Sequence, residues 1–101
     1  MCVNSNTMAE SYIVESEIII RAVDKPFHER QVLGVFVSSE IAYQFVEKYI
    51  EDSKNLHTYF SRSIICSKED YEENIIQGKL VAINIVLGQF EDMIYVRKAS
   101  V

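Results

Sequence analysis

The sequence predicts an α+β fold, in which a single small domain forms a mostly antiparallel sheet with one main helix packed on one face. Two observations indicate this fold. Five segments have the composition or the two-residue alternation of β-strands, and one stretch, residues 38–54, repeats its apolar residues at helical spacing. The predicted elements follow in the order β-β-α-β-α-β-β, which a helix laid across an antiparallel sheet satisfies.

Length and composition fit one folded domain. The chain has 101 residues, of which 49% are hydrophobic, and it contains only three glycines and one proline, which excludes a disordered or low-complexity chain. Residues 1–9 are polar and aperiodic, so we expect a flexible leader there and the domain at residues 10–101. The apolar runs are too short to span a bilayer and the N-terminus does not read as a secretion signal, which predicts a cytoplasmic protein with no membrane contact.

The charge of the chain limits the class of partner. The net charge is −5, from 15 acidic and 10 basic residues. A partner held mainly through phosphate contacts requires clustered lysines and arginines, so we expect no direct nucleic-acid binding. An acidic balance by itself indicates solubility and little else.

Two predicted strands begin the domain. Residues 12–23 alternate, and one face of this strand carries charged side chains that should look partly to water. Residues 24–30 are the expected connection, because the proline within them cannot donate a ladder hydrogen bond, and the side chains after the proline should lie at an exposed tip. Residues 32–37, VLGVFV, are apolar on both faces, which predicts an interior strand with a neighbour packed closely over Gly34.

The main helix is predicted at about residues 39–53. Its apolar residues recur at intervals that place them along one side of a helix with 3.6 residues per turn. Ser38 or Ser39 is the expected N-cap, and Asn55 suits the left-handed position at the C-terminal end. The expected buried stripe consists of Ile41, Ala42, Phe45, Val46, Tyr49 and Ile50.

The C-terminal half contains the remaining elements. Residues 57–66 form a predicted strand with a polar middle, which suits a sheet edge. Residues 67–70, SKED, match a helix start and Gly78 a helix stop, so a short helix is expected at residues 68–77, on the rim of the fold. A hairpin follows, with a strand at 79–87, a turn at 88–92 and a returning strand at 93–98.

The pattern GVFxSxExAxxF at residues 34–45 resembles small bacterial and phage proteins of uncharacterised type, in which a short β-hairpin leads into a helix. The residues of this pattern are all ones that the fold itself requires. The resemblance implies a microbial or phage accessory protein and implies no particular activity.

The chain offers few residues suited to catalysis or metal binding. His28 and His57 have no Cys, His or carboxylate at a ligand spacing apart from the adjacent Glu29. Cys66 precedes a helix start, where a thiol can become acidic, but no base stands beside it in sequence, and Cys66 and Cys2 are interpreted as free thiols. The glycines stand alone, so no phosphate-binding loop is expected. We therefore expect no enzyme, no cofactor and no metal site.

Two acidic segments form a candidate binding surface. KEDYEEN at residues 68–74 surrounds one tyrosine with four carboxylates, and EDMIY at residues 91–95 sets an acid pair near another tyrosine. Tyrosine supplies contact area at low entropic cost, and carboxylates select a basic partner. A solvated helix face is the alternative interpretation. The predicted partner-binding residues are Glu69, Asp70, Tyr71, Glu72, Glu73, Glu91 and Asp92.

These observations predict a non-enzymatic, acidic protein-binding module whose protein partner has a basic surface. One form of it is a phage-encoded inhibitor of a host nucleic-acid-handling defence protein, anti-CRISPR-like, whose carboxylates would lie where phosphates lie in a basic channel. Two alternatives stay open. One is a homodimeric scaffolding protein formed by pairing an exposed sheet edge. The other is a small ligand-sensing domain or enzyme with a pocket between helix and sheet.

Overall fold

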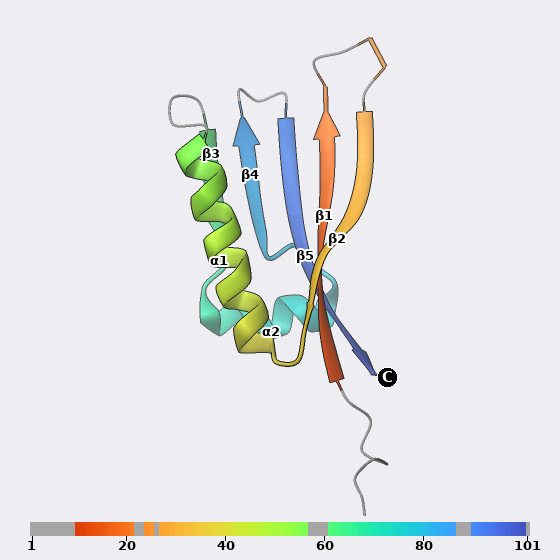
Figure 1. The fold of residues 1–101 in the computed structure, drawn as a ribbon, viewed down its shortest axis with the longest axis vertical. Coiled ribbons are helices and arrows are strands. Elements are labelled where there is room, and N and C mark those ends of the chain that lie inside the picture. Colours follow the sequence, from red (N-terminus) through yellow and green to blue (C-terminus); the bar gives the residue numbers. More distant parts are fainter. Residues whose placement is uncertain (1–9, 22–23, 26, 57–60, 87–89, 101) are drawn as a thin grey trace, which may run out of the picture.

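The computed structural model describes residues 10–21, 24–25, 27–56, 61–86 and 90–100 (Figure 1). Within these ranges the elements follow the predicted order, and the α+β fold is confirmed. The predicted leader and Cys2 lie outside the described residues. The elements are β1 (Glu10–Ile20), β2 (Phe27–Phe36), α1 (Ser39–Leu56), β3 (Ser61–Ile65), α2 (Lys68–Gln77), β4 (Ala82–Val86) and β5 (Phe90–Ser100).

The described strands form one five-stranded sheet in the order β2-β1-β5-β4-β3, and each neighbouring pair is antiparallel. β1 and β5 form its long centre and pair from Glu10↔Ser100 to Ile20↔Phe90. β4 has only five residues and pairs with the first half of β5, Phe90–Ile94. α2 lies against the second half of β5, below the ends of β3 and β4 in Figure 1.

The segment predicted to be an interior strand lies instead at the edge of the sheet. Among the described strands, β2 pairs with β1 alone, and its side chains Val32 and Val35 are 55% and 59% exposed. The apolar composition predicted burial, but the neighbours of a strand come from tertiary pairing, which composition does not encode. The close packing over Gly34 is confirmed, since a Cβ atom there would lie 2.8 Å from the ring of Phe36 on the same strand.

Both predicted turns are wrong in their extent. Phe27 and His28, expected at an exposed tip, are the first residues of β2, although both side chains remain exposed. Glu91 and Asp92, expected in the turn at residues 88–92, lie near the start of β5. The reason is the length of β1, because both neighbouring strands extend their backbone hydrogen bonds to its end.

α1 crosses one face of the sheet and continues past residue 53 to Leu56. Its most deeply buried side chains are Ala42, Tyr43, Val46 and Ile50. Ile41, which the predicted stripe includes, is 45% exposed, whereas Tyr43, which it omits, is buried. The buried side is rotated toward Tyr43 because α2 packs there, and the periodicity of one helix carries no information about a second helix.

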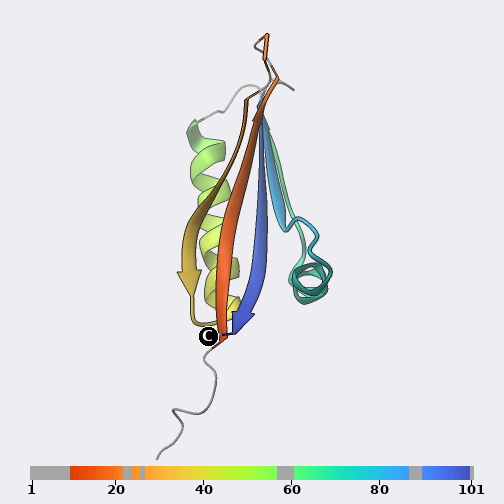
Figure 2. The same cartoon turned by 90° about the vertical axis from the view of Figure 1, so that its right-hand side faces the viewer.

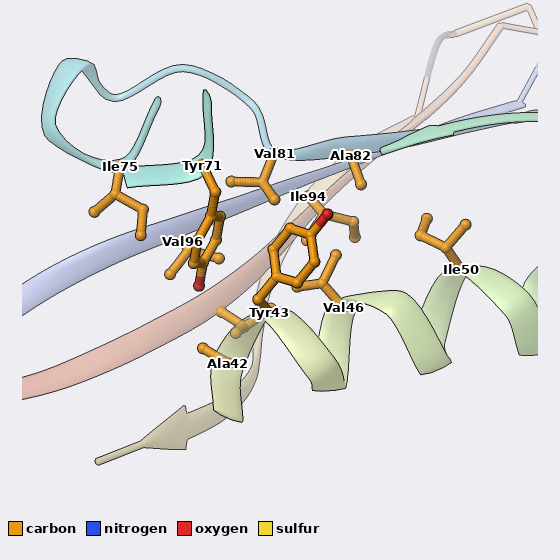
Figure 3. Close-up of a cluster of buried hydrophobic side chains, with 11 residues drawn as sticks. Ala42, Tyr43, Val46, Ile50, Tyr71, Ile75, Val81, Ala82, Ile94 and Val96 are labelled. Atoms are coloured by element: carbon orange, nitrogen blue, oxygen red, sulfur yellow. The ribbon is translucent and has the colours of Figure 1, made fainter. Parts of the chain in front are cut away.

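α2 begins and ends at the predicted residues. Ser67 is its N-cap and accepts a hydrogen bond from the Asp70 amide, and Gly78 ends it with φ of 69° in the left-handed region. The expected position on the rim is wrong, since Tyr71 and Ile75 are 4% and 7% exposed and belong to the core. Figure 3 shows both side chains directed toward the same cluster as those of α1.

Strand alternation divides the sheet into two faces. On the helix-covered face, Val14, Ile94 and Val96 belong to one core with the buried residues of α1 and α2. Figure 3 shows Ile94 and Val96 within this cluster. No helix of the described residues packs on the opposite face, which we call the open face. The long strands twist between their two ends, so α1 and α2 lie on different sides of the view in Figure 2 although both contact one core.

Candidate functional site

The first turns of the two helices meet at a small surface pocket, which we call the helix junction. The pocket has a volume of about 240 Å³. α1 and α2 each contribute three of its residues, which are Ser39, Glu40, Tyr43, Lys68, Tyr71 and Glu72.

Local sequence explains why both helices begin here. Ser38 accepts a hydrogen bond from the Ile41 amide at the start of α1, as Ser67 does from the Asp70 amide at the start of α2. The positive end of a helix dipole favours carboxylates, which accounts for Glu40 in the first turn of α1. Two helix starts, each followed by acids, therefore bring carboxylates to one place.

Two tyrosines form the floor of the junction. Their rings meet edge to face with centroids 4.7 Å apart, Tyr43 from α1 and Tyr71 from α2. The Tyr43 hydroxyl donates to the Cys66 carbonyl and the Tyr71 hydroxyl donates to the Ser39 carbonyl, each at 2.7 Å. Burial raises the pKa of both phenols above the ordinary value of 10.0, because the charged phenolate is poorly solvated there. Both phenols are therefore neutral donors at physiological pH, and their rings remain as an apolar floor.

Two carboxylates and one ammonium group line the rim. Glu72 accepts a 2.8 Å hydrogen bond from the Ser39 hydroxyl, which joins the two helices, and Glu40 is exposed beside it in the pocket lining. The Lys68 ammonium lies 5.9 Å from the centroid of the Tyr43 ring, at the distance of a cation–π contact. The arrangement, carboxylates around an aromatic floor, suits the binding of a cationic group.

The structure separates the predicted site residues into three groups. Glu69, Asp70, Glu72 and Glu73 are exposed on α2, and Glu72 lines the junction. Tyr71 is 4% exposed and serves as the floor, so it is not a freely accessible contact residue. The other two predicted residues, Glu91 and Asp92, lie near the start of β5. This end of β5 is remote from α2 (Figure 1).

The acids of β5 do not join the helix junction. Glu91 lies on the open face and pairs with Arg21 at 2.7 Å. Asp92 is 3% exposed on the covered face, so its carboxylate is enclosed within the fold rather than presented on the surface beside Glu91. The physical reason is strand alternation, which sends adjacent residues to opposite faces once the predicted turn proves to be a strand.

Asp92 has a structural role in a second, enclosed cluster. Its carboxylate accepts hydrogen bonds from the hydroxyls of Ser16 and Tyr49, and these donors offset the loss of hydration. Burial, followed by the hydrogen bond to Asp92, raises the pKa of Tyr49 to about 12. The Ser63 hydroxyl donates to Asn84 at 2.8 Å on the neighbouring strands. This cluster lies beneath α1 and stabilises the covered face.

Sequence reasoning missed four residues of the junction, which are Ser39, Glu40, Tyr43 and Lys68. The available signal was the pair of helix starts, each with a serine cap followed by acids. Sequence spacing could not show that the two helix starts meet, because Ser39 and Lys68 lie 29 residues apart in the chain and in separate elements. Only the tertiary packing of α2 on α1 makes one site of them.

The remaining candidate residues lie away from the helix junction or outside the described residues. No group of three or more His, Cys, Asp and Glu side chains in the described ranges is arranged to hold a metal ion, and no described helix is both long and apolar enough to cross a membrane. His28 lies 3.0 Å from Glu17 on the open face, and His57 lies outside the described residues. Burial raises the pKa of the Cys66 thiol, which opposes the acidic thiol that a nucleophile requires.

Comparison with known proteins adds no relative. No protein-family model, curated protein or solved structure matches the chain. The fold and the helix junction define a small α+β domain with an acidic, aromatic-floored recess.

Proposed function

We propose that the protein is a non-enzymatic binding module that engages a basic protein partner at the helix junction. The observation that supports this most is the pocket itself, which combines a tyrosine floor with the rim carboxylates Glu40 and Glu72. Three further exposed acids of α2, Glu69, Asp70 and Glu73, extend the negative surface beside it. A lysine or arginine side chain of the partner would enter the pocket with its charge among the carboxylates.

The physical chemistry of the pocket favours a cation over an anion or an apolar ligand. A guanidinium or ammonium over a tyrosine ring gains about 0.5–1 kcal/mol at an exposed site, and hydrogen bonds to a carboxylate are stronger than neutral ones. The side chain of Lys68 already holds its ammonium over Tyr43, so the ring accepts a cation. An incoming cationic side chain would displace Lys68 toward solvent.

The narrower form of this proposal names the partner. A phage-encoded inhibitor of a host nucleic-acid-handling defence protein, anti-CRISPR-like and acting in the cytoplasm, would present these acids to a channel that normally binds phosphates. The net charge of −5 and the resemblance of residues 34–45 to small bacterial and phage proteins support this form.

The test is a titration with a defined cation, an oligo-arginine peptide, followed by NMR amide shifts and by calorimetry at low and high salt. The variant is Glu40→Gln with Glu72→Gln, in which the amide oxygen of residue 72 still accepts from Ser39. We expect shifts centred on the junction and an affinity about tenfold weaker in the variant. Added salt should weaken binding to the parent.

The matched control is Glu47→Gln with Glu51→Gln, on the exposed side of α1. It removes the same two charges, so it reports the general effect of net charge on peptide binding. Lys68→Ala should have the opposite effect on affinity. This variant removes the cation that competes for the Tyr43 ring and should tighten peptide binding a few-fold. Equal losses in the two glutamine pairs would show that the junction is only part of a solvated acidic surface.

The same variants test the narrower form in a bacterial lysate. A partner retained by the parent at low salt, and lost with Glu40→Gln and Glu72→Gln but not with the control pair, would be identified by mass spectrometry. A retained protein that does not bind nucleic acid would overturn the inhibitor form and leave the binding module standing.

A further inference from the structure

All four arginines of the chain lie on the open face of the sheet. Register and alternation place Arg30 of β2, Arg62 of β3 and Arg97 of β5 there, and Arg21 joins them by its ion pair with Glu91. No lysine of the described strands belongs to this face. We call it the arginine face, and its other members include Ile64, Ile83 and Tyr95.

Arg21, Arg30 and Arg97 are held in contacts within the face. Glu15 pairs with Arg97 at 2.9 Å and with Arg30 at 3.6 Å, and the Arg30 guanidinium lies 5.1 Å from the centroid of the Tyr95 ring. An incoming phosphate would have to displace these carboxylates. The face therefore does not resemble a phosphate-binding surface, which leaves arginines unpaired for the ligand.

The half of the face formed by β3, β4 and the start of β5 carries a row of apolar side chains beside Arg62 and Glu91. Ile64, Ile83 and Met93 lie directly opposite one another across the three strands, and Ile85 follows on β4. Ile64 is 49% exposed, and Val32 and Val35 on the far edge of the sheet are more than half exposed. Neighbouring apolar side chains that stay accessible are typical of a surface that another protein covers.

The composition and charge of the face suit contact with another copy of the chain. Arginine, tyrosine and methionine are enriched at protein interfaces and lysine is depleted. Four arginines and three glutamates, Glu15, Glu17 and Glu91, give the face a formal charge of +1, whereas the chain carries −5. Two copies would therefore meet with the least repulsion at this face.

The size of the face is also sufficient. The strands have 11, 10, 11, 5 and 5 residues. At about 4.8 Å between strands and about 3.4 Å per residue they cover about 700 Å², close to the roughly 800 Å² that each partner contributes to a standard stable interface.

We infer that a second copy of this chain packs on the arginine face, so that the protein is a homodimer with two sheets face to face. The two copies would be related by a two-fold axis, so that the same face of each sheet contributes to the interface, as in the packing of a β-sandwich. The helix junction lies on the covered side of the sheet and stays free, so this inference does not depend on the proposed function.

The test is sedimentation equilibrium of the full chain over a range of concentrations. We expect the mass to approach twice the 11.7 kDa of the monomer. Ile64→Glu, on the arginine face, should weaken dimerisation at least about tenfold. Its matched control is Ile76→Glu, since Ile76 is 83% exposed on α2, away from this face, and this variant should dimerise like the parent.

A second pair keeps the inference testable if Ile64→Glu does not fold, as judged by circular dichroism. Arg62→Glu reverses one exposed charge on the arginine face, and Lys79→Glu makes the same change in charge outside it. We expect only Arg62→Glu to weaken the dimer. A parent that stays monomeric at the highest soluble concentration overturns the inference, and so does a dimer that both members of a pair leave intact, as an edge-paired dimer would be.

Discussion

Adjacent residues of β5 experience two different environments. Asp92 and Ile94 point to the helix-covered face and are 3% and 0% exposed, whereas Glu91 and Met93 point to the open face and are only partly buried. One of these residues on each face carries a carboxylate. The carboxylate of Asp92, on the covered face, is enclosed by hydroxyl donors, whereas that of Glu91, on the open face, pairs with the solvent-exposed Arg21.

This difference separates residues that stabilise the fold from residues that the fold does not require. A buried carboxylate without hydrogen-bond donors would strongly destabilise the fold. The hydroxyls of Ser16 and Tyr49 supply these donors to Asp92 and so allow its burial. Exposed ion pairs contribute about 0–1 kcal/mol each, so stability alone does not explain the arginines of the open face. Their concentration there is a property that the inferred contact with a second copy would explain.

The largest expected effect is at the centre of the covered face. Ile94→Ala should lower the free energy of unfolding by about 2–5 kcal/mol, because it leaves a cavity among fully buried side chains. Met93→Ala, the next residue and on the opposite face, should lower it by clearly less. Urea denaturation of both variants below the concentration of any dimer measures the difference, and equal losses would contradict the assignment of the two faces.

A smaller effect is expected from the two carboxylates. Asp92→Ala leaves the Ser16 and Tyr49 hydroxyls without their acceptor and should lower the free energy of unfolding by about 1–3 kcal/mol. Glu91→Ala removes one ion pair with an exposed arginine and should change it by less than about 1 kcal/mol. Urea denaturation of the two variants measures both changes in the free energy of unfolding. A larger loss for Glu91→Ala would mean that the open face contributes more stability than its exposure indicates.

The smallest effect concerns alkaline pH and the covered face. The pKa of Tyr49 is raised from 10.0 to about 12, so its neutral form stabilises the folded state. That contribution is fully present below pH 10 and is lost as the pH rises through 12, and the raised pKa values of Tyr43 and Tyr71 act in the same direction. Unfolding free energies measured from pH 8 upward should therefore fall above pH 10. The fall should be shallower in Tyr49→Phe, and an identical fall in this variant would remove Tyr49 as a contributor.

Local patterns in the sequence determined the class and order of the elements. The stripe of apolar residues at residues 38–54 predicted α1, and the serine cap and Gly78 predicted both ends of α2, because helix periodicity and caps are properties of neighbouring residues. The alternation of residues 12–23 also predicted that one face of β1 would look partly to water. Glu15 and Glu17 are on that face.

Tertiary structure alone decided where these elements lie. The apolar segment at residues 32–37 is at the edge of the sheet, Tyr43 is buried and Ile41 exposed because α2 packs beside α1, and Asp92 is enclosed rather than offered to a partner. Each outcome depends on contacts between segments distant in the chain. Hydrophobic burial depends on which surfaces pack together. The alternation of a strand or the apolar stripe of a helix identifies an apolar face but not the element that packs against it. For the same reason, the helix junction and the arginine face are formed only by the tertiary arrangement of separate helices and strands.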